Sequence, residues 1–231
     1  MTSNSKTMKV NATIEETIRN KVLAENEERE PSGRLAAGKL GWPLQWQMLW
    51  HFKVPTAPLD EYTLRKFQRG KDVEDRIVAW MEPEKTQVPV TYREVVGFAD
   101  MVLDYPIEVK SVTNMAFKHI QREGPKYGHR LQGELYAKGL GFDKFGVAYV
   151  ASDDYRVLCF EEEVTDETDK VIDAYEAQVK LGTVPVFEEK EPWHAIKKYS
   201  IYPDWMKLSE EEIAEKLAAG DYQIKQTVIK L

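Results

Sequence analysis

Three residues near the middle of the chain have the types and spacing that phosphodiester hydrolysis needs. Asp100 stands eight residues before Glu108, and Lys110 follows two residues later. A hairpin centred on Asp104 would place Asp100 and Glu108 opposite each other on one face, with Cβ atoms about 5 Å apart. Two carboxylates at that separation repel each other unless a cation lies between them, and hard divalent cations prefer such oxygens.

Lys110 would lie on the same face as Glu108, because alternate side chains of a strand point the same way. A divalent cation held by the two carboxylates would polarise a phosphoryl oxygen and acidify a water, and the ammonium would orient that water or offset the developing charge. These roles suit hydrolysis of a phosphodiester. The structural alternative is a solvent-facing strand with a Glu–Lys pair.

The sequence around these residues predicts three strands in succession. Apolar residues alternate with polar ones over residues 88–96, which is typical of a half-buried strand. Residues 98–103 and 107–112 predict two further strands, joined across Asp104-Tyr105-Pro106. These strands would carry the carboxylates and the lysine.

Helices are expected before the strands. A capping box of Thr13 and Glu16 predicts a helix over residues 13–28, after a loose tail, and Pro43 can open a second helix. Asp60 can cap a third helix that ends near residue 83. Its expected apolar stripe consists of Leu64, Phe67, Ile77 and Trp80.

The second half of the chain predicts more helices and a hairpin. Helices are expected over residues 114–123, 127–140, 166–181 and 209–220, and a hairpin over 145–160. This order predicts an α/β fold with a mixed central β-sheet flanked by helices. We expect a single domain that has a tail and helix (1–30), a core (31–182) and a C-terminal extension packed on that core (183–231).

The composition favours a soluble globular protein. The 231 residues are 42% hydrophobic and 31% charged, and no apolar run is long enough to cross a membrane. We therefore expect a cytoplasmic protein without membrane contact. The single cysteine, Cys159, excludes an intrachain disulfide framework and a four-cysteine metal or iron–sulphur site. Its strand pattern predicts a buried, inert thiol.

The net charge of −7 is unevenly distributed. The basic stretch, residues 110–144, has seven basic and three acidic residues, whereas the acidic segment, residues 153–176, has ten acidic and two basic ones. The basic stretch also carries aromatic residues, so it is a candidate strand-binding surface, with solvated helix faces as the alternative. We expect the acidic segment to face away from it. The candidate DNA-binding residues are Ser111, Thr113, Lys118, Lys126, His129 and Arg130.

Asp100 followed by Glu108-Val109-Lys110 resembles the motif of PD-(D/E)XK nucleases. Gly97 fits the GxxD form of the RecB-type branch, which includes the CRISPR-associated RecB-like exonucleases; phage exonucleases of the lambda type share the wider fold. Gln132-Gly133-Glu134-Leu135-Tyr136 matches the QxxxY motif of that branch. Residues 69–74 look like the helix that supplies a further metal ligand, and the resemblance covers about residues 32–165.

This resemblance implies a restriction-endonuclease-like core and assigns roles to individual residues. It implies that Mg²⁺ or Mn²⁺ is held by Glu74, Asp100, Glu108 and the carbonyl oxygen of Val109. It further implies that Lys110 positions the attacking water and that Gln132 and Tyr136 hold the scissile strand. The catalytic set would then be Asp100, Glu108, Lys110, Gln132 and Tyr136.

The chain departs from the family in three respects. Ala99 stands where some relatives have the proline of the motif name, and the iron–sulphur cysteines of other relatives are absent. We expect packing by Trp193, Tyr199, Tyr202 and Trp205 to replace such a cluster. No phosphate-binding loop of helicases occurs, so no ATP-driven unwinding is expected from this chain.

The resulting hypothesis is a metal-dependent DNA nuclease, an exonuclease of recombination, repair or phage replication. Its partners would be single- or double-stranded DNA ends, with further copies of itself in a homo-oligomer or a recombination protein. The main alternative is a nuclease-fold module that binds DNA or a partner without catalysis. Another metal-dependent enzyme or an acidic structural protein with a chance motif is a second alternative.

Overall fold

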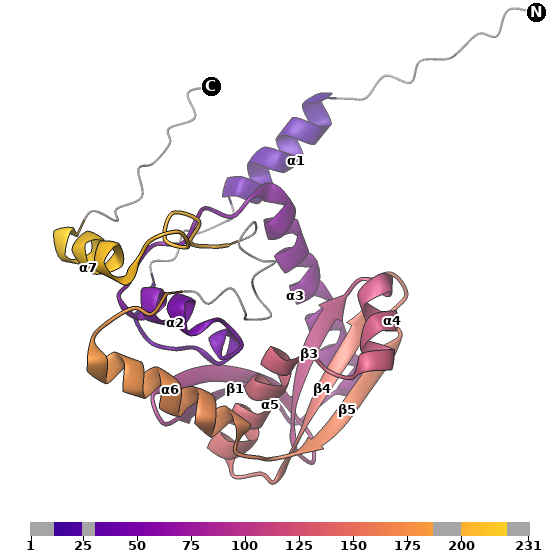
Figure 1. The fold of residues 1–231 in the computed structure, drawn as a ribbon. Helices are drawn as coiled ribbons and strands as arrows, with labels where there is room; N and C mark the ends of the chain where they lie inside the picture. The colour runs from indigo at the N-terminus through magenta and orange to yellow at the C-terminus, as the bar shows by residue number, and fades with distance from the viewer. Residues whose placement is uncertain (1–11, 25–30, 187–199, 221–231) are drawn as a thin grey trace, which may run out of the picture.

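The computed structural model describes residues 12–24, 31–186 and 200–220, and it has a twisted five-stranded sheet with helices on both faces (Figure 1). The strands lie in the order β1-β2-β3-β4-β5. The described elements are α1 (Ala12–Ala24), η1 (Ala37–Lys39), α2 (Leu44–His51), α3 (Glu61–Met81), β1 (Lys85–Tyr92), β2 (Val95–Val102), β3 (Pro106–Val112), α4 (Asn114–Glu123), α5 (Tyr127–Leu140), β4 (Lys144–Ala151), β5 (Val157–Glu163), α6 (Glu167–Leu181) and α7 (Glu210–Ala219).

The sheet is mixed, as the sequence predicted. Strands β1, β2 and β3 form an antiparallel meander, β3 and β4 are parallel, and β4 and β5 form an antiparallel hairpin. The parallel pair needs a crossover, which α4 and α5 provide. The α/β class with a mixed central sheet and flanking helices is therefore confirmed.

One expected strand is in fact parts of two strands. The alternation over residues 88–96 continues through a tight turn at Arg93 and Glu94, where Arg93 has φ 52°. Val95 pairs with Tyr92 directly across this turn. The sequence pattern hides the turn because neither turn residue is glycine, asparagine or proline, the usual turn signals.

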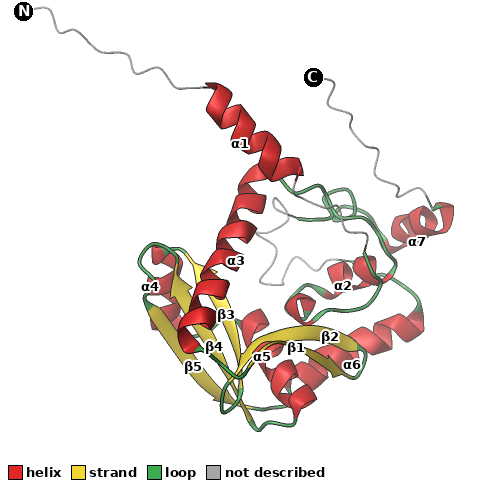
Figure 2. Ribbon diagram, turned by 180° about the vertical axis from the view of Figure 1, so that it is seen from behind, coloured by secondary structure: helices red, strands yellow, loops and turns green. Residues whose placement is uncertain are grey.

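Helices cover the two faces of the sheet differently (Figures 1 and 2). On one face α3 packs Val73 and Ile77 against apolar residues of β2, β3 and β4, and we name this group the α3-side cluster. On the other face α5 packs Leu131 and Leu135 in a larger group with β1, β2, α2 and α6, named the α5-side cluster. A third cluster joins α4 to β4. The central strands β2, β3 and β4 are thus covered on both faces.

Helix α3 begins where the sequence predicted, but its buried face differs. The Asp60 side chain accepts a hydrogen bond from the Thr63 backbone at 2.7 Å. Ile77 is buried as expected, whereas Phe67 and Trp80 are each 60% exposed. The expected stripe is wrong at Phe67 because the first half of α3 runs past the sheet towards α1, where no strand covers it (Figure 1). It is also wrong at Trp80, which lies in the last turn of α3 outside the α3-side cluster and packs its ring on Tyr155.

The termini of the other helices follow their sequence signals to within a few residues. Ser209 and Glu212 form the complete capping box at the start of α7, and Gly141, Gly182 and Gly220 end α5, α6 and α7 with positive φ. Helix α1 starts at Ala12, one residue earlier than predicted, and residues 25–28 of that prediction lie outside the described residues.

The described part of the C-terminal extension contacts the sheet's helices. Tyr202, Trp205 and Met206 belong to the α5-side cluster, and Ile213 of α7 joins them. Trp46 of α2 donates a hydrogen bond to the sulfur of Met206 at 3.1 Å. Trp193 and Tyr199, which we expected to contribute, lie outside the described residues.

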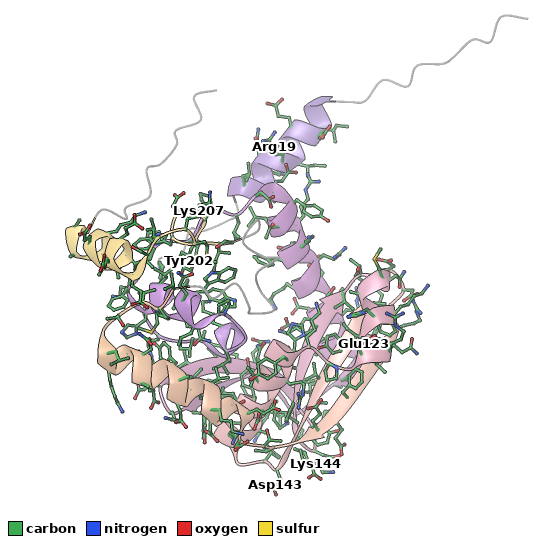
Figure 3. All side chains as sticks on the ribbon, in the orientation of Figure 1. Arg19, Glu123, Asp143, Lys144, Tyr202 and Lys207 are labelled. Carbon is green, nitrogen blue, oxygen red and sulfur yellow. The ribbon has the colours of Figure 1, made fainter. Side chains whose placement is uncertain are left out.

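The edge strand β5 and the turn before β4 carry exposed side chains. Asp143 and Lys144 project outward between α5 and β4 (Figure 3). The prediction for Cys159 is wrong, because this thiol is exposed: β5 is the edge strand, and its side chains alternate between partial and full exposure. None of the described helices combines the length and the apolar composition that crossing a membrane requires.

Candidate active site

Asp100 and Glu108 lie where β2 and β3 separate. The two strands pair at Met101–Ile107 and Val102–Pro106, and continuing this register places Asp100 opposite Glu108. Beyond Met101 the backbone ladder stops, and the carboxylate of Asp100 accepts a hydrogen bond from the Val109 backbone N–H at 2.7 Å. A side chain therefore replaces a strand carbonyl as the acceptor, which opens the sheet at this point.

The strand also changes face at Asp100. Ala99 packs in the α5-side cluster, whereas Met101 packs in the α3-side cluster. In a regular strand both side chains would point the same way. The irregularity coincides with Gln87 on β1, which lies across from Asp100 and has φ 48°, an unusual value for a residue with a side chain. The backbone is thus distorted at the candidate site.

Glu108 is a buried carboxylate with one partnered and one unpartnered oxygen. Its side chain is 2% exposed, and Oε1 accepts a hydrogen bond from the Lys110 ammonium. Oε2 is buried without a hydrogen-bond partner. Burial, reinforced by the charge of Asp100, raises the pKa of Glu108 to about 8 even though Lys110 opposes the shift. Burial thus disfavours the charged form of Glu108, and a nearby cation stabilises it.

Lys110 remains a cation. Burial would lower the pKa of its ammonium, but the adjacent Glu108 carboxylate and then Asp100 outweigh burial, and the pKa is raised. Its side chain is partly exposed, so the ammonium can reach a bound molecule as well as Glu108. The raised pKa favours the protonated form of Lys110, which acts as a hydrogen-bond donor and a positive charge.

Helix α3 brings Glu74 to the two strands through Gln87. The Gln87 amide nitrogen donates to Glu74 Oε1 at 2.7 Å and lies 3.3 Å from Asp100 Oδ1. Burial, followed by the charge of Asp100, raises the pKa of Glu74, and burial likewise raises that of Asp100. Gln87 is a site residue that the sequence pattern did not indicate, since its place opposite Asp100 follows from the β1–β2 register.

The two residues of the QxxxY motif meet one another beside this site. Gln132 donates to the Tyr136 hydroxyl at 2.8 Å, as their positions one helical turn apart allow. The Tyr136 ring lies against Gly97, where a Cβ atom would be only 2.8 Å from Tyr136 Cε1. The absence of a side chain at Gly97 of the GxxD motif thus makes room for the ring of Tyr136 of the QxxxY motif.

Burial and then the charges of Glu108 and Asp100 influence the pKa of the Tyr136 hydroxyl. Its side chain is 2% exposed, and burial raises the pKa of its hydroxyl, with Glu108 and Asp100 adding to the effect. The phenol is therefore neutral and can donate a hydrogen bond. The structure places Gln132 and Tyr136 near the carboxylate–lysine group, so all five expected catalytic residues occupy one region.

The expected DNA contacts are more scattered. Thr113 caps α4 by accepting a hydrogen bond from Ala116 at 3.3 Å, and the Ser111 hydroxyl is buried without a partner. Lys118 and Lys126 are exposed and form no ion pair within the described residues. These two lysines are the accessible positive charges of the candidate set.

His129 and Arg130 are already engaged within the protein. The His129 ring contacts the Tyr149 hydroxyl at 2.9 Å, and burial, followed by Lys110 and Lys126, lowers its pKa to about 3. His129 is therefore neutral and brings no positive charge to a phosphate. Arg130 pairs with Glu162 at 2.6 Å and with Glu167 at 3.4 Å.

The acidic segment does not face away from the basic stretch, contrary to our expectation. Besides the two partners of Arg130, it supplies Asp169 to Lys138 at 2.6 Å and Glu161 to Lys144 at 2.8 Å. Segments that are separate in sequence thus neutralise each other across α5, β4, β5 and α6. The basic stretch is a weaker polyanion surface than its net charge indicated.

The donor atoms fit a small divalent cation held largely by water. Within residues 12–24, 31–186 and 200–220, no group of three or more His, Cys, Asp or Glu side chains is arranged to hold a metal ion. Asp100 and Glu108 form a pair, and the unpartnered Glu108 oxygen is the atom that a cation would satisfy. Mg²⁺ commonly takes only one or two protein carboxylates. Glu74 lies beside this pair and is linked to Asp100 by the Gln87 amide.

Comparisons with known proteins identify the fold. No known protein family matches the sequence, and no curated protein is similar to it. An alkaline exonuclease, LHK-Exo from Laribacter hongkongensis, matches with TM-score 0.50 and 15% identity over 71% of this chain and 93% of that one. Its complex with dAMP matches with TM-score 0.50 and 14% identity, over 72% and 93%.

A third solved structure, the protein SSO0001, matches with TM-score 0.51 and 15% identity over 85% of this chain and 98% of that one. Nearly the whole of each compared chain is thus covered. At such low identity the likeness concerns the fold. It confirms the restriction-endonuclease-like, α/β architecture that the motif resemblance implied.

Proposed function

We propose that this protein is a metal-dependent deoxyribonuclease of the PD-(D/E)XK type, with the RecB-like exonucleases as its nearest branch. The observation that carries the proposal is the buried Asp100–Glu108 pair at the opening between two strands, with the Lys110 ammonium on Glu108. Its fold is shared with an alkaline exonuclease whose structure is also known with dAMP.

The proposed reaction is hydrolysis of a phosphodiester at a DNA end. Asp100, Glu108 and the Val109 carbonyl would hold Mg²⁺ or Mn²⁺, with Glu74 completing the set. When bound, the cation supplies Lewis-acid activation of the phosphate and of the attacking water. The buried Glu108 oxygen without a hydrogen-bond partner supports this assignment, because a cation would satisfy it.

Lys110 serves the attack by hydrogen bonding. In the reaction a water oxygen bonds to phosphorus and gives up a proton to solvent, one phosphorus–oxygen ester bond breaks, and the released alkoxide takes up a proton from solvent. The protonated ammonium orients that water and offsets the negative charge that grows on the phosphoryl oxygens. Its hydrogen bond to Glu108 fixes the ammonium in place.

Gln132 and Tyr136 would hold the strand that is cut. Gln132 is partly exposed and donates to the Tyr136 hydroxyl, which leaves the phenolic proton free to face an acceptor. A phosphate oxygen is such an acceptor. Exonucleolytic action on ends, in recombination, repair or phage replication, is the biological role that we infer for this site.

The decisive experiment measures degradation of linear DNA in Mg²⁺ or Mn²⁺. Lys110→Ala and the near-isosteric Lys110→Met should lower the rate by at least about 100-fold, the size of a lost transition-state donor. Both should remain folded, because Glu108 can take up a proton once its partner is removed. Lys180→Ala, an exposed lysine of α6, is the matched control.

Substrates with open and with blocked ends, single- and double-stranded, separate exonuclease from endonuclease action. An exonuclease degrades only the open-ended DNA. Equal residual cleavage by the wild type and both Lys110 variants would refute the nuclease proposal. Retained DNA binding in that case would favour the non-catalytic binding module.

A further inference from the structure

The first half of α3 projects from the sheet as a basic and aromatic surface. Residues 62–71 contain four basic residues and no acidic one, in a chain whose net charge is −7. Tyr62 is 67% and Phe67 60% exposed, although both are large apolar rings. The exposed Phe67 ring lies next to Leu64 in one pocket, and apolar side chains that gather at the surface mark interaction sites.

Helical geometry connects this surface to the carboxylates. Phe67 and Glu74 are seven residues apart, so they lie on the same face of α3 at a distance of about 10 Å along the axis. Lys71 lies between them on that face, 4.0 Å from Glu74, and it pairs with Asp75 at 2.7 Å. Gly70 has open space around it.

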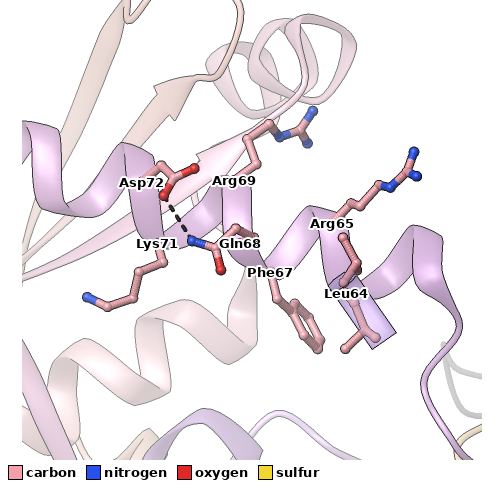
Figure 4. A pocket seen from close by; sticks show the side chains of 8 residues that line it. Leu64, Arg65, Phe67, Gln68, Arg69, Lys71 and Asp72 are labelled. Carbon is pink, nitrogen blue, oxygen red and sulfur yellow. Dashed lines mark hydrogen bonds between the residues drawn. The ribbon is translucent and has the colours of Figure 1, made fainter. Parts of the chain in front are cut away.

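A pocket of about 450 Å³ opens along the same part of α3, with Val22 of α1 as the residue from outside the helix (Figure 4). Leu64 and Phe67 extend to one side of α3, and Arg65 and Arg69 extend to the other. This volume lies within the range of small-ligand sites. On the Phe67 side of α3 the pocket combines the apolar Leu64 and Phe67 with one cation, Lys71.

Two of the four cations of this surface are unpaired within the described residues, as are Lys118 and Lys126 of the basic stretch. Arg65 pairs with Glu61 on its own helix. Lys66 lies 4.0 Å above the Tyr62 ring, and Lys66 and Arg69 form no ion pair within the described residues. By contrast, Arg130, Lys138 and Lys144 are neutralised by the acidic segment. A polyanion would therefore be attracted to α3.

We propose that the Phe67 face of α3 binds the unpaired bases of single-stranded DNA and leads that strand to Asp100 and Glu108. The Phe67 ring stacks on a base, and Lys71 contacts the phosphate between that base and the site. Stacking requires an exposed base face, which a single strand offers and a duplex hides. This inference rests on the proposed function for the position of the cut.

Binding is measured in the Lys110→Ala background, so that no probe is degraded. The probes are a fluorescein-labelled oligothymidylate and a closed dumbbell duplex, and the readout is fluorescence anisotropy in Mg²⁺. Phe67→Ala should weaken binding of the oligothymidylate by at least about fivefold, the lower bound for one lost base stack. Phe67→Trp should retain it, and binding of the dumbbell should not change.

Two further variants test the nature of the contact. Phe67→Leu keeps an apolar side chain without a ring, and it should lose affinity as Phe67→Ala does. Met115→Ala, at a position of α4 that is 83% exposed, is the control and should have no effect. Circular dichroism and thermal melting verify that each variant is folded.

The inference is overturned if Phe67→Ala binds the oligothymidylate as its parent does, if Phe67→Leu retains full affinity, or if both probes weaken equally. These outcomes leave the nuclease proposal intact, because that proposal depends on cleavage by the wild type. Conversely, a wild type that cleaves nothing while binding depends on Phe67 refutes the enzyme and leaves the single-strand surface.

Discussion

Asp100 receives contacts from two neighbouring strands. β3 provides the Val109 N–H to one of its oxygens, and Gln87 of β1 lies 3.3 Å from the other. The same amide donates to Glu74 at 2.7 Å, so one uncharged side chain holds two carboxylates that would repel each other. Gln87 has a positive φ, and backbone strain of this kind often accompanies functional sites.

Two substitutions of Gln87 distinguish the effect of its hydrogen bonds on Mg²⁺ binding from the effect of its backbone strain on stability. Gln87→Ala and Gln87→Gly both remove the amide, and we expect each to weaken Mg²⁺ binding about tenfold, as loss of an outer-shell partner does. Gln87→Gly should be about 1 kcal/mol more stable than Gln87→Ala, because only glycine adopts φ 48° without cost.

Calorimetric titration with Mg²⁺ and chemical denaturation measure the two effects. Gln68→Ala, which removes an exposed amide of α3 from its bond to Asp72, is the control. Unchanged Mg²⁺ affinity in both Gln87 variants would contradict a role in holding the carboxylates.

At the scale of elements, α5 contacts both the candidate site and α6 through residues of one motif. Gln132 and Tyr136 face the candidate site, whereas Glu134 between them points to the start of α6. Its carboxylate is 3% exposed and accepts hydrogen bonds from the backbone and hydroxyl groups of Thr165 and Thr168. One residue of the motif thus joins two helices, and the other two line the site.

We therefore expect Glu134→Ala to destabilise the protein by about 2–4 kcal/mol, because several buried donors lose a charged acceptor. Its effect on Mg²⁺ affinity should be absent, since the carboxylate faces away from Asp100 and Glu108. Urea denaturation and Mg²⁺ titration of the same sample measure both quantities. Glu123→Ala, an exposed residue of α4, should change stability by less than about 0.5 kcal/mol. Loss of Mg²⁺ binding in folded Glu134→Ala would place this residue in the site instead.

For the whole molecule, the distribution of charge limits how DNA can bind. The net charge is −7, and much of the basic stretch is paired with the acidic segment. Among the described residues, the basic side chains of α3, Lys118 and Lys126 are the main cations left for sequence-independent contacts with DNA phosphates. A cation between the carboxylates and a phosphate would therefore contribute a large share of the affinity.

Removal of the metal should accordingly reduce binding strongly. We expect Lys110→Ala protein to bind the oligothymidylate in Mg²⁺ and to lose at least about tenfold in affinity in EDTA at constant ionic strength. Anisotropy at several salt concentrations also gives the number of phosphates contacted. Tight, steeply salt-dependent binding in EDTA would show that the protein's own cations suffice.

The sequence by itself determined the features that depend on near neighbours. Asp100, Glu108 and Lys110 are joined by one hairpin, and Gln132 and Tyr136 by one helical turn, so spacing alone placed each group correctly. Capping residues and glycines likewise predicted most helix ends, since a helix terminus depends on a few adjacent residues.

Only the tertiary structure decided what distant segments do to one another. The fit of Tyr136 against Gly97, the contact of Gln87 with Glu74, and the exposure of Phe67 each depend on residues from separate elements. The same holds for the neutralised basic stretch. Periodicity and spacing describe which residues share a face, but which element covers that face is set by packing of the whole chain, and here that packing leaves α3 partly uncovered.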